Sequence, residues 1–383
     1  MKIAYCIRSL KGAGGMERVL ANKANYLAEK LGYEVIIITL DEPDYTPFFE
    51  FSPRIRRCGL GVKYIDSKQK SPLFSPWVTL ANMRKHRKAL EQLLCQLRVD
   101  IVVSMFDTEA RFLWKIKDGS KKVLEIHFSQ WGRKRMNRSR SGYGVDYLKN
   151  LYDNWVVGKY DAFVVLTEED RRLWKHARNI SVIYNACTLT VHEPAVLENK
   201  QVVAVGRLTE QKGFDWLISI WKIVSEAYPD WRLVIVGEGE QKAMLEEEIR
   251  SRNLRERVEI RPFTRAIVPV YLESSVYVMT SRYEGFPMVL IEAMACGLPV
   301  VSFACPSGPT EIIREGKNGF LVPVGDCGLF AERICQLIGD CRLRAQMGKE
   351  AILDSDRFTE DQIMEKWDHL FKTLSCSDEN LLL

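Results

Sequence analysis

The sequence has no long hydrophobic run. Its longest apolar stretches, such as residues 35–40, have the length of a β-strand, whereas about 20 apolar residues are needed for a helix to cross a bilayer. The chain also begins directly with an apolar stretch, without the charged segment and long apolar core of a secretory signal. These absences exclude a membrane-spanning helical class, and we expect no signal peptide.

Clustered cysteines are also absent. The ten cysteines are scattered singly and none forms a C-x-x-C pair, so zinc sites and disulfide frameworks are not indicated. We expect buried free thiols in a reducing cytosol. A D-x-D pattern at Asp354 and Asp356 lies in a polar helical tail and follows no strand. We interpret it as a solvated turn or cap and predict no metal site.

Several nucleotide and cofactor signatures are missing. Neither G-x-G-x-x-G nor G-x-x-x-x-G-K-[ST] occurs, and the first absence argues against a nicotinamide dehydrogenase. A phosphorylase that uses pyridoxal phosphate would need a lysine site for that group and usually a longer chain. We find no aromatic-rich basic module of the kind that binds nucleic acid. We therefore expect no bound cofactor and no nucleic-acid partner.

Strand-length apolar stretches alternate with helical patterns along the whole chain. The expected strands are residues 3–7, 35–40, 101–104, 123–126, 162–166, 182–184, 202–205, 233–236, 258–260, 276–279 and 299–302. This alternation predicts parallel sheets with helices on both faces. Because 383 residues exceed the usual domain of roughly 100–200 residues, we expect two doubly wound α/β domains.

The expected boundary lies near residues 188–199, where Pro194 and polar residues interrupt the pattern. We assign residues 1–192 to an N-terminal domain and 193–358 to a C-terminal domain. Ligands of such sheets bind at the carboxyl ends of the strands. Two facing domains would then form a site in the cleft between them.

Charge is distributed unevenly between the halves. Residues 1–200 hold 34 Lys and Arg against 22 Asp and Glu, a balance of +12, and the rest hold 21 against 28, a balance of −7. The basic residues cluster at positions 84–88 and 133–140. This asymmetry suggests that the first half meets an anionic surface, such as a membrane, although a solvated basic face explains it as well.

Two sets of residues could bind phosphate. Gly14 and Gly15 lie between a strand and a helix, where the backbone can approach an anion at the helix start; a tight turn is the equal alternative. Arg207 and Lys212 flank the end of the strand at 202–205. They could hold one diphosphate, or both could be ordinary surface cations.

The segment 281–297 gives the sharpest signal. Glu284 lies in a loop after an apolar strand, Pro287 suits the first turn of a helix, and Gly297 ends that helix. Glu292 lies inside this otherwise apolar helix, so its carboxylate must be paired or must bind a ligand. Hydroxyls of a sugar or a ribose are suitable ligands, and a buried salt bridge is the alternative.

Histidines are few. Four of the five, at positions 86, 176, 192 and 369, lie in polar or charged contexts, and we expect them on the surface. His127 ends an apolar strand at its carboxyl end. It is a candidate polar group near a reacting sugar, and a structural histidine is the alternative.

Together these residues resemble the retaining glycosyltransferases of family four, which have the GT-B fold of two facing Rossmann-like domains. Glu284 to Gly297 looks like the E-x7-E signature of that family. Gly206-Arg207, Lys212-Gly213, Gly14-Gly15-x-Glu17 and the segment 307–313 also match. The likeness covers about residues 1–370 and is strongest over 202–323.

The resemblance implies a role for each matching position. Arg207 and Lys212 would hold the donor diphosphate with Gly15, Glu284 would bind the donor sugar, and Glu292 the ribose. His127 would be the catalytic-centre histidine, together with Glu284, Arg207 and Lys212. The last helix, about residues 359–383, would cross back onto the first domain. The expected donor-binding set is Gly14, Gly15, Gly206, Arg207, Lys212, Gly237, Phe263, Glu284, Gly285, Phe286, Pro287, Met288 and Glu292.

Two positions depart from the family pattern. Thr264 and Arg265 stand where the family often has a glycine near the base, which leaves the identity of the base open, and Ala304 stands where relatives commonly have Asp. We expect metal-independent transfer of a hexose from a UDP-sugar, with retention, to a lipid-linked saccharide acceptor, in polysaccharide or lipopolysaccharide synthesis. The expected location is cytoplasmic, peripheral at the inner face of the membrane. A GT-B protein that binds nucleotide sugar without turnover is the alternative.

Overall fold

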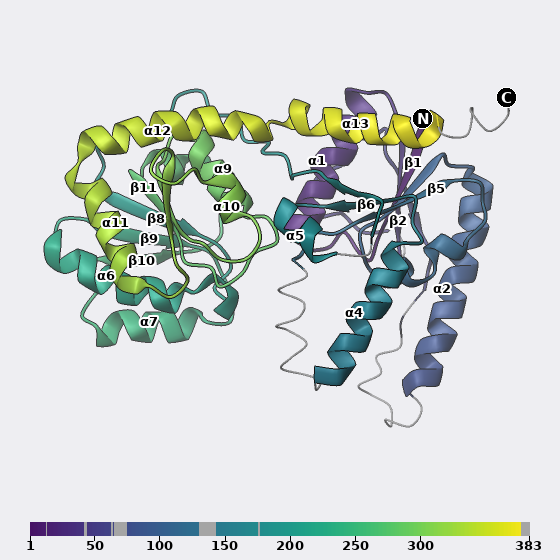
Figure 1. Cartoon of the computed structure of the whole chain (residues 1–383), viewed down its shortest axis with the longest axis horizontal. Coiled ribbons are helices and arrows are strands. Elements are labelled where there is room, and N and C mark those ends of the chain that lie inside the picture. Colours follow the sequence, from purple (N-terminus) through teal and green to yellow (C-terminus); the bar gives the residue numbers. More distant parts are fainter. Residues whose placement is uncertain are drawn as a thin grey trace.

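Two fully parallel β-sheets form the framework of the chain (Figure 1). The computed structural model describes residues 1–12, 14–41, 44–62, 64, 75–129, 143–174 and 177–376. The N-terminal sheet has seven strands in the order β3-β2-β1-β4-β5-β6-β7. Its strands are β1 (Lys2–Ile7), β2 (Glu34–Thr39), β3 (Arg56–Gly59), β4 (Ile101–Ser104), β5 (Lys121–Glu125), β6 (Ala162–Val165) and β7 (Ile180–Val182).

The C-terminal sheet has six strands in the order β10-β9-β8-β11-β12-β13. They are β8 (Gln201–Val205), β9 (Arg232–Val236), β10 (Val258–Arg261), β11 (Val276–Met279), β12 (Val300–Phe303) and β13 (Gly319–Val322). The predicted α/β class with two parallel sheets is therefore confirmed. The sequence reading missed the edge strands β3 and β13, and it placed β7 two residues too late.

Helices cover both faces of each sheet. Those of the N-terminal half are α1 (Gly15–Glu29), α2 (Ser75–Leu97), α4 (Tyr143–Val157) and α5 (Glu168–Leu173). Those of the C-terminal half are α6 (Phe214–Ala227), α7 (Lys242–Ser251), α8 (Val268–Leu272), α9 (Met288–Ala295), α10 (Pro309–Ile312), α11 (Cys327–Gly339) and α12 (Cys341–Ser355). In the described part of the chain, no helix combines the length and the apolar character needed to cross a membrane.

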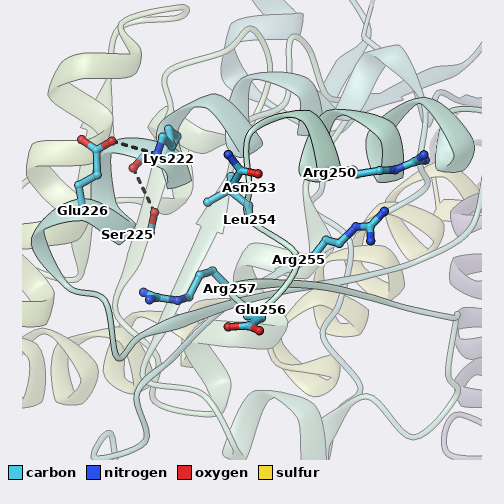
Figure 2. Close-up of a pocket in the computed structure, with 9 residues that line it drawn as sticks. All are labelled: Lys222, Ser225, Glu226, Arg250, Asn253, Leu254, Arg255, Glu256 and Arg257. Carbon is cyan, nitrogen blue, oxygen red and sulfur yellow. Dashed lines mark hydrogen bonds and ion pairs between the residues drawn. The ribbon is translucent and has the colours of Figure 1, made fainter.

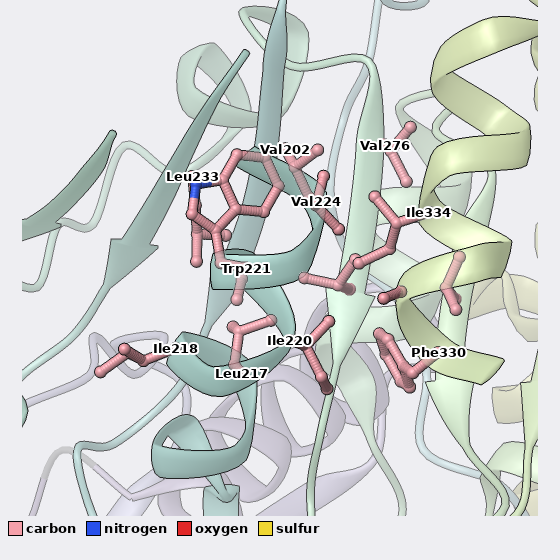
Figure 3. Packing of buried hydrophobic residues seen from close by; sticks show 14 of the residues in the cluster. Val202, Leu217, Ile218, Ile220, Trp221, Val224, Leu233, Val276, Phe330 and Ile334 are labelled. Atoms are coloured by element: carbon pink, nitrogen blue, oxygen red, sulfur yellow. The ribbon is translucent and has the colours of Figure 1, made fainter. Parts of the chain in front are cut away.

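Apolar helix faces build a separate core on each side of the C-terminal sheet. On one side α6 and α11 pack on the strands; Trp221 of α6 is fully buried, and Phe330 and Ile334 of α11 belong to the same cluster (Figure 3). On the other side α9 packs through Leu290 and Ile291. Each such side chain contributes about 1.5–3 kcal/mol when it leaves water. These cores hold the carboxyl ends of the strands, and the loops that follow them, in place.

The last helix, α13 (Glu360–Cys376), joins the core of the N-terminal half. It follows α12, which lies along the C-terminal half, and itself lies along the N-terminal half (Figure 1). Its residues Ile363, Met364, Trp367 and Phe371 are buried against α1 and the N-terminal sheet. The N-terminal core is therefore completed by the opposite end of the chain.

Two predictions about polar residues are wrong. His86 is buried on α2 and shares a 2.9 Å hydrogen bond with the Tyr64 hydroxyl; burial lowers the pKa of His86 to about 4. The D-x-D prediction is wrong for Asp354, which is buried and accepts hydrogen bonds from Arg314 and Asn318, whereas Asp356 is exposed and is the C-cap of α12, as predicted. Among the described residues, no group of three or more His, Cys, Asp or Glu could hold a metal ion.

The cysteines are free thiols, as predicted. Cys6, Cys296 and Cys305 are buried, but Cys95, Cys341 and Cys376 are exposed. The expectation that the thiols lie in the core is thus correct for only some of them.

Replacing Trp367 by alanine should lower the free energy of unfolding by about 3–5 kcal/mol, because a large buried ring would leave a cavity between α13 and the N-terminal core. Urea denaturation measures this change. Leu353, which is exposed on α12, is the control: its replacement by alanine should change stability by less than about 0.5 kcal/mol. Equal effects of both replacements would show that α13 does not stabilise this core.

Candidate functional site

Two buried carboxylates lie where the strands of the C-terminal sheet end. Glu284 follows β11 in the loop before α9 and is 6 % exposed. Glu292 lies one turn inside α9 and is 4 % exposed. The predicted helix start is confirmed to within one residue, since Pro287 is the N-cap and Met288 the first helical residue. Because both carboxylates are buried, each needs a polar or charged partner.

The partner of Glu284 is Lys212. The Lys212 ammonium lies 2.7 Å from Glu284 Oε1, and the lysine follows β8 on the short helix η4 (Glu210–Lys212). Its alkyl chain packs on Gly206, where a Cβ atom would be only 3.2 Å from Lys212 Cδ. Arg207, the next residue, is exposed at the same strand end. The structure therefore brings Lys212, Gly206 and Glu284 together and leaves the Arg207 side chain open to solvent.

The partners of Glu292 come from both halves of the chain. Arg18 Nη2, on α1, lies 2.5 Å from Glu292 Oε1. The Tyr271 hydroxyl donates to Glu292 Oε2 at 3.2 Å. Burial and the nearby Glu292 carboxylate raise the pKa of Tyr271 well above its usual value, so this hydroxyl keeps its proton. Glu292 is thus held on one oxygen by a cation and on the other by a neutral donor.

Close backbone contacts require glycine at two positions of the site. A Cβ atom on Gly237 would lie 1.9 Å from the Gly206 carbonyl oxygen, so the loops after β8 and β9 touch. A Cβ atom on Gly285 would lie 2.7 Å from the carbonyl oxygen of His127 and 3.2 Å from Phe128 Cα. The loop of Glu284 therefore meets the end of β5 backbone to backbone, across the junction of the two halves.

His127 lies at the carboxyl end of β5, as predicted, but its ring is buried. The side chain is 5 % exposed, and Nε2 lies 2.9 Å from Oε1 of Glu125, without the angle of a good hydrogen bond on either ring nitrogen. Glu125 also receives the buried ammonium of Lys23. Burial alone would raise the pKa of Glu125, but Lys23 and His127 outweigh it and lower the pKa to about 2. In this structure the ring of His127 belongs to a buried charged group, and its backbone faces Gly285.

The carboxylate of Glu17 partly covers the glycine loop before α1. Cβ atoms on Gly12 and Gly14 would lie 2.6 and 2.3 Å from carboxylate oxygens of Glu17, whereas a Cβ atom on Gly15 would have no atom within 4 Å. Gly14 is the N-cap of α1. Gly15 therefore keeps an open approach for a ligand, and Gly14 does not.

The aromatic members of the predicted set lie in different surroundings. Phe263 follows β10 and is 53 % exposed. The Phe286 ring stacks on Tyr184 at 5.3 Å and contacts Phe358, so only the Phe286 backbone is free to face a ligand. Arg265 lies against Phe48 of the N-terminal half, 4.5 Å from the ring centre.

Hydrogen bonds to the carboxylates of Glu169 and Glu311 join the two halves near Glu284. Glu169 accepts from the backbone N–H of Ser307 at 2.8 Å, and Glu311 accepts from the backbone N–H of Glu169 at 2.9 Å. The Ser307 hydroxyl also bonds to Ser129 at 2.7 Å. A pocket of about 600 Å³ opens next to these contacts, and its lining comes from both halves: Glu168, Glu169, Arg172, Tyr184, Ala304, Cys305, Pro306, Thr310 and Glu311.

A second hollow, of about 550 Å³, lies on the outer face of the C-terminal half (Figure 2). It is formed where α6 and α7 end and β10 begins, with Arg257 and Arg255 at its edge. The amino end of β10 lies opposite the carboxyl ends that carry Glu284 and Glu292. This hollow contains no residue of the predicted site.

Sequence reasoning missed four residues of the site: Arg18, Lys23, Glu125 and Tyr271. Arg18 follows Glu17 in the first turn of α1, at the edge of the glycine loop, and this position was its only signal. Lys23 and Glu125 are charges inside apolar patterns, the same signal that identified Glu292. Nothing local distinguishes Tyr271 from other core tyrosines.

Comparison with known proteins covers both halves. Residues 13–190 match the family model described as Glycosyltransferase Family 4, and residues 190–354 match Glycosyl transferases group 1. A glycosyltransferase of Haemophilus influenzae is 31% identical over 373 residues, 96% of this chain and 98% of its own length. The lipopolysaccharide 1,6-galactosyltransferase of Salmonella typhimurium is 25% identical over 88% of this chain and 90% of its own.

Solved structures show the same fold. Sucrose-phosphate synthase from Thermosynechococcus elongatus superposes with a TM-score of 0.80 at 20% identity, over 98% of this chain and 99% of the other. Anabaena HepE in complex with UDP-glucose superposes with a TM-score of 0.73 at 19% identity, over 97% and 100%. The arrangement of two parallel sheets is therefore the GT-B fold.

Replacing Gly285 by alanine should lower the free energy of unfolding by about 1–3 kcal/mol, because the new methyl group would collide with the backbone of His127 and Phe128. Denaturant unfolding measures this change. Gly328 is the matched control, since a Cβ atom there would meet only one Asp326 oxygen at 3.8 Å; alanine at this helical position should leave stability unchanged or raise it. Wild-type stability of the Gly285 variant would contradict the close backbone contact.

Proposed function

The chain belongs to the family 4 glycosyltransferases, and we propose that it transfers a hexose from a UDP-sugar to a saccharide acceptor with retention of configuration. The observation that carries this proposal is the pair of buried carboxylates, Glu284 and Glu292, on either side of the start of α9. Carboxylates accept hydrogen bonds from hydroxyl groups. In our proposal Glu284 binds the sugar and Glu292 binds the ribose.

The leaving diphosphate is stabilised by charge in this proposal. Lys212 lies beside Glu284, the exposed Arg207 is at the same strand end, and the start of α9 supplies the positive end of a helix dipole. The open approach at Gly15 lets a phosphate come close from the N-terminal half. Fixed donors that face a developing negative charge often make the largest contribution to catalysis, and they do here what a metal ion does in other enzymes.

The proposed reaction proceeds by attack from the side of the leaving group. Both buried carboxylates of the site, Glu284 and Glu292, are already held by cations, so neither is an obvious covalent nucleophile. We propose His127 as the polar group of the reaction centre, because the end of β5 lies directly against Gly285. Glu125, whose Oε1 lies 2.9 Å from His127 Nε2, is the charged neighbour of this ring.

Relatives support a saccharide acceptor from cell-surface polymer synthesis. An amylovoran biosynthesis glycosyltransferase of Erwinia amylovora is 38% identical over 223 residues, and the Salmonella relative acts on lipopolysaccharide by its name. Solved structures of HepE contain UDP-glucose, and one of the pneumococcal transferase GtfA contains UDP and GlcNAc. These names favour a UDP-sugar donor and a saccharide acceptor for the present chain, and we propose that this acceptor is lipid-linked.

We further propose that the N-terminal half docks on an anionic membrane. Helices α2 and α4 extend from the same side of this half (Figure 1). Arg84, Lys85 and Lys88 are exposed on α2, and α4 exposes Leu151, Tyr152 and Trp155. Basic groups with exposed aromatic rings suit the interface of an anionic bilayer. The second basic cluster, residues 133–140, lies outside the described residues.

Replacing Glu284 by glutamine or Lys212 by alanine should reduce sugar transfer by about 10²-fold or more, because each change removes one charge of the Lys212–Glu284 pair, which faces the donor in our proposal. Release of UDP from a mixture of UDP-glucose, UDP-galactose and UDP-GlcNAc measures the rate. The Lys222→Ala variant, which breaks only a surface pair with Glu226, should retain full activity. Near-wild-type turnover of either site variant would refute the assignment, and binding of UDP-sugar without turnover in the wild type would favour the non-catalytic alternative.

Replacing Trp155 by alanine should weaken sedimentation with phosphatidylglycerol vesicles, and so should joint replacement of Arg84, Lys85 and Lys88. Each basic group near such a surface contributes about 1 kcal/mol, an attraction that salt screens. Phosphatidylcholine vesicles are the control and should bind little protein. Sedimentation that depends on neither anionic lipid nor salt would contradict docking.

A further inference from the structure

Arg18 connects the N-terminal half to the donor side of the junction. It lies in the first turn of α1, and its backbone N–H bonds to the Gly14 carbonyl at 3.2 Å. Its guanidinium reaches Glu292 on α9, 274 positions further along the chain, at 2.5 Å. The side chain is 36% exposed, whereas that of Glu292 is 5% exposed. An accessible cation from one half therefore neutralises a buried anion of the other.

The guanidinium of Arg18 is the counter-charge of the Glu292 carboxylate. Among the described residues, the Tyr271 hydroxyl is the other group that bonds to this carboxylate, and it is neutral. A buried carboxylate without a counter-charge is costly and tends to take up a proton. Protonation would turn one oxygen from an acceptor into a donor. Arg18 thus preserves the acceptor character that a hydroxyl ligand needs.

The carboxylate keeps capacity for two more hydrogen bonds. Its two oxygens offer about four acceptor positions; Arg18 uses one on Oε1 and Tyr271 uses one on Oε2. One position remains on each oxygen, which matches the two adjacent hydroxyls of a ribose. We propose that Arg18 is a positioning residue of the nucleotide site: it supplies the counter-charge of the buried Glu292 carboxylate and orients it for the ribose hydroxyls, and it does so from the opposite half of the molecule. This inference rests on the proposed function, in which Glu292 binds the ribose.

The opposite possibility is that Arg18 only fills the site until ribose displaces it. Ribose hydroxyls are neutral, so they cannot replace the positive charge beside a buried carboxylate. Arg18 also uses one Nη2 contact to Glu292 out of the five N–H donors of a guanidinium, and it need not leave when the hydroxyls arrive. If Arg18 stays on Glu292, the ribose site is complete only while the two halves are closed.

Isothermal titration of UDP and of 2′,3′-dideoxy-UDP into the Arg18→Ala and Arg18→Lys variants tests this proposal. Arg18→Ala should weaken UDP binding by about tenfold or more. It should leave the weaker binding of dideoxy-UDP nearly unchanged, because that ligand lacks the two ribose hydroxyls that Glu292 would bind. Arg18→Lys should recover part of the UDP affinity. Arg250→Ala, which breaks a surface pair with Glu247 on α7, is the matched control and should bind both ligands like the wild type.

The two possibilities predict opposite changes in UDP affinity when Arg18 is replaced by alanine. Tighter or unchanged UDP binding by Arg18→Ala would overturn the proposal, as would an equal loss for both ligands, which indicates a general structural effect. Arg18→Lys as weak as Arg18→Ala would contradict the counter-charge role. Failure of the proposed function looks different, because the wild-type protein itself would then bind neither ligand.

Discussion

Burial of two carboxylates at the start of α9 is the constraint on which the rest of the site depends. A buried charge is costly unless it is paired, and the chain pairs Glu284 with Lys212 and Glu292 with Arg18. The Lys212 pair is local to the C-terminal half, whereas the Arg18 pair spans the junction. Glu284 therefore has its counter-charge within the C-terminal half alone, whereas Glu292 has its counter-charge only when both halves are in contact.

The contacts around this site all demand a close approach of the two halves. Glycine at position 285 lets the loop of Glu284 touch the backbone of His127, and the exchanged carboxylates of Glu169 and Glu311 fasten the neighbouring loops. Helix α13 carries the chain back onto the N-terminal core. Charge pairing, backbone contact and chain connection thus favour the same closed arrangement, in which groups from both sheets face one ligand.

Patterns with local causes could be predicted from the sequence. The central strands of both sheets, such as β4 and β11, are continuous apolar runs, and the alternation of such runs with helical patterns predicted them. The edge strand β3, with the sequence RRCG, has no apolar pattern, because pairing with β2 alone defines it. The start of α9 and the position of both carboxylates also followed from the sequence.

Partners from distant segments could not be predicted. His86 stands among charged residues in the sequence, yet Tyr64 and Phe112 enclose its ring. Asp354 belongs to a D-x-D pattern, but it is buried and accepts hydrogen bonds from Arg314 and Asn318. Arg18 meets Glu292 only through the docking of the two halves. In each case the sequence contains the polar residue, but tertiary contacts with distant segments determine its environment.

The central claim is that Glu284 and Glu292 together bind a nucleotide sugar. Thermal unfolding in the presence of UDP-glucose, GDP-mannose and ADP-glucose, for the wild type and for a Glu284→Gln, Glu292→Gln double variant, tests it most directly. A ligand that binds only the folded state raises the unfolding temperature. We predict that the UDP-sugar stabilises the wild type and that the double variant loses this stabilisation. No stabilisation by any of the three, or equal stabilisation of both proteins, would contradict the account.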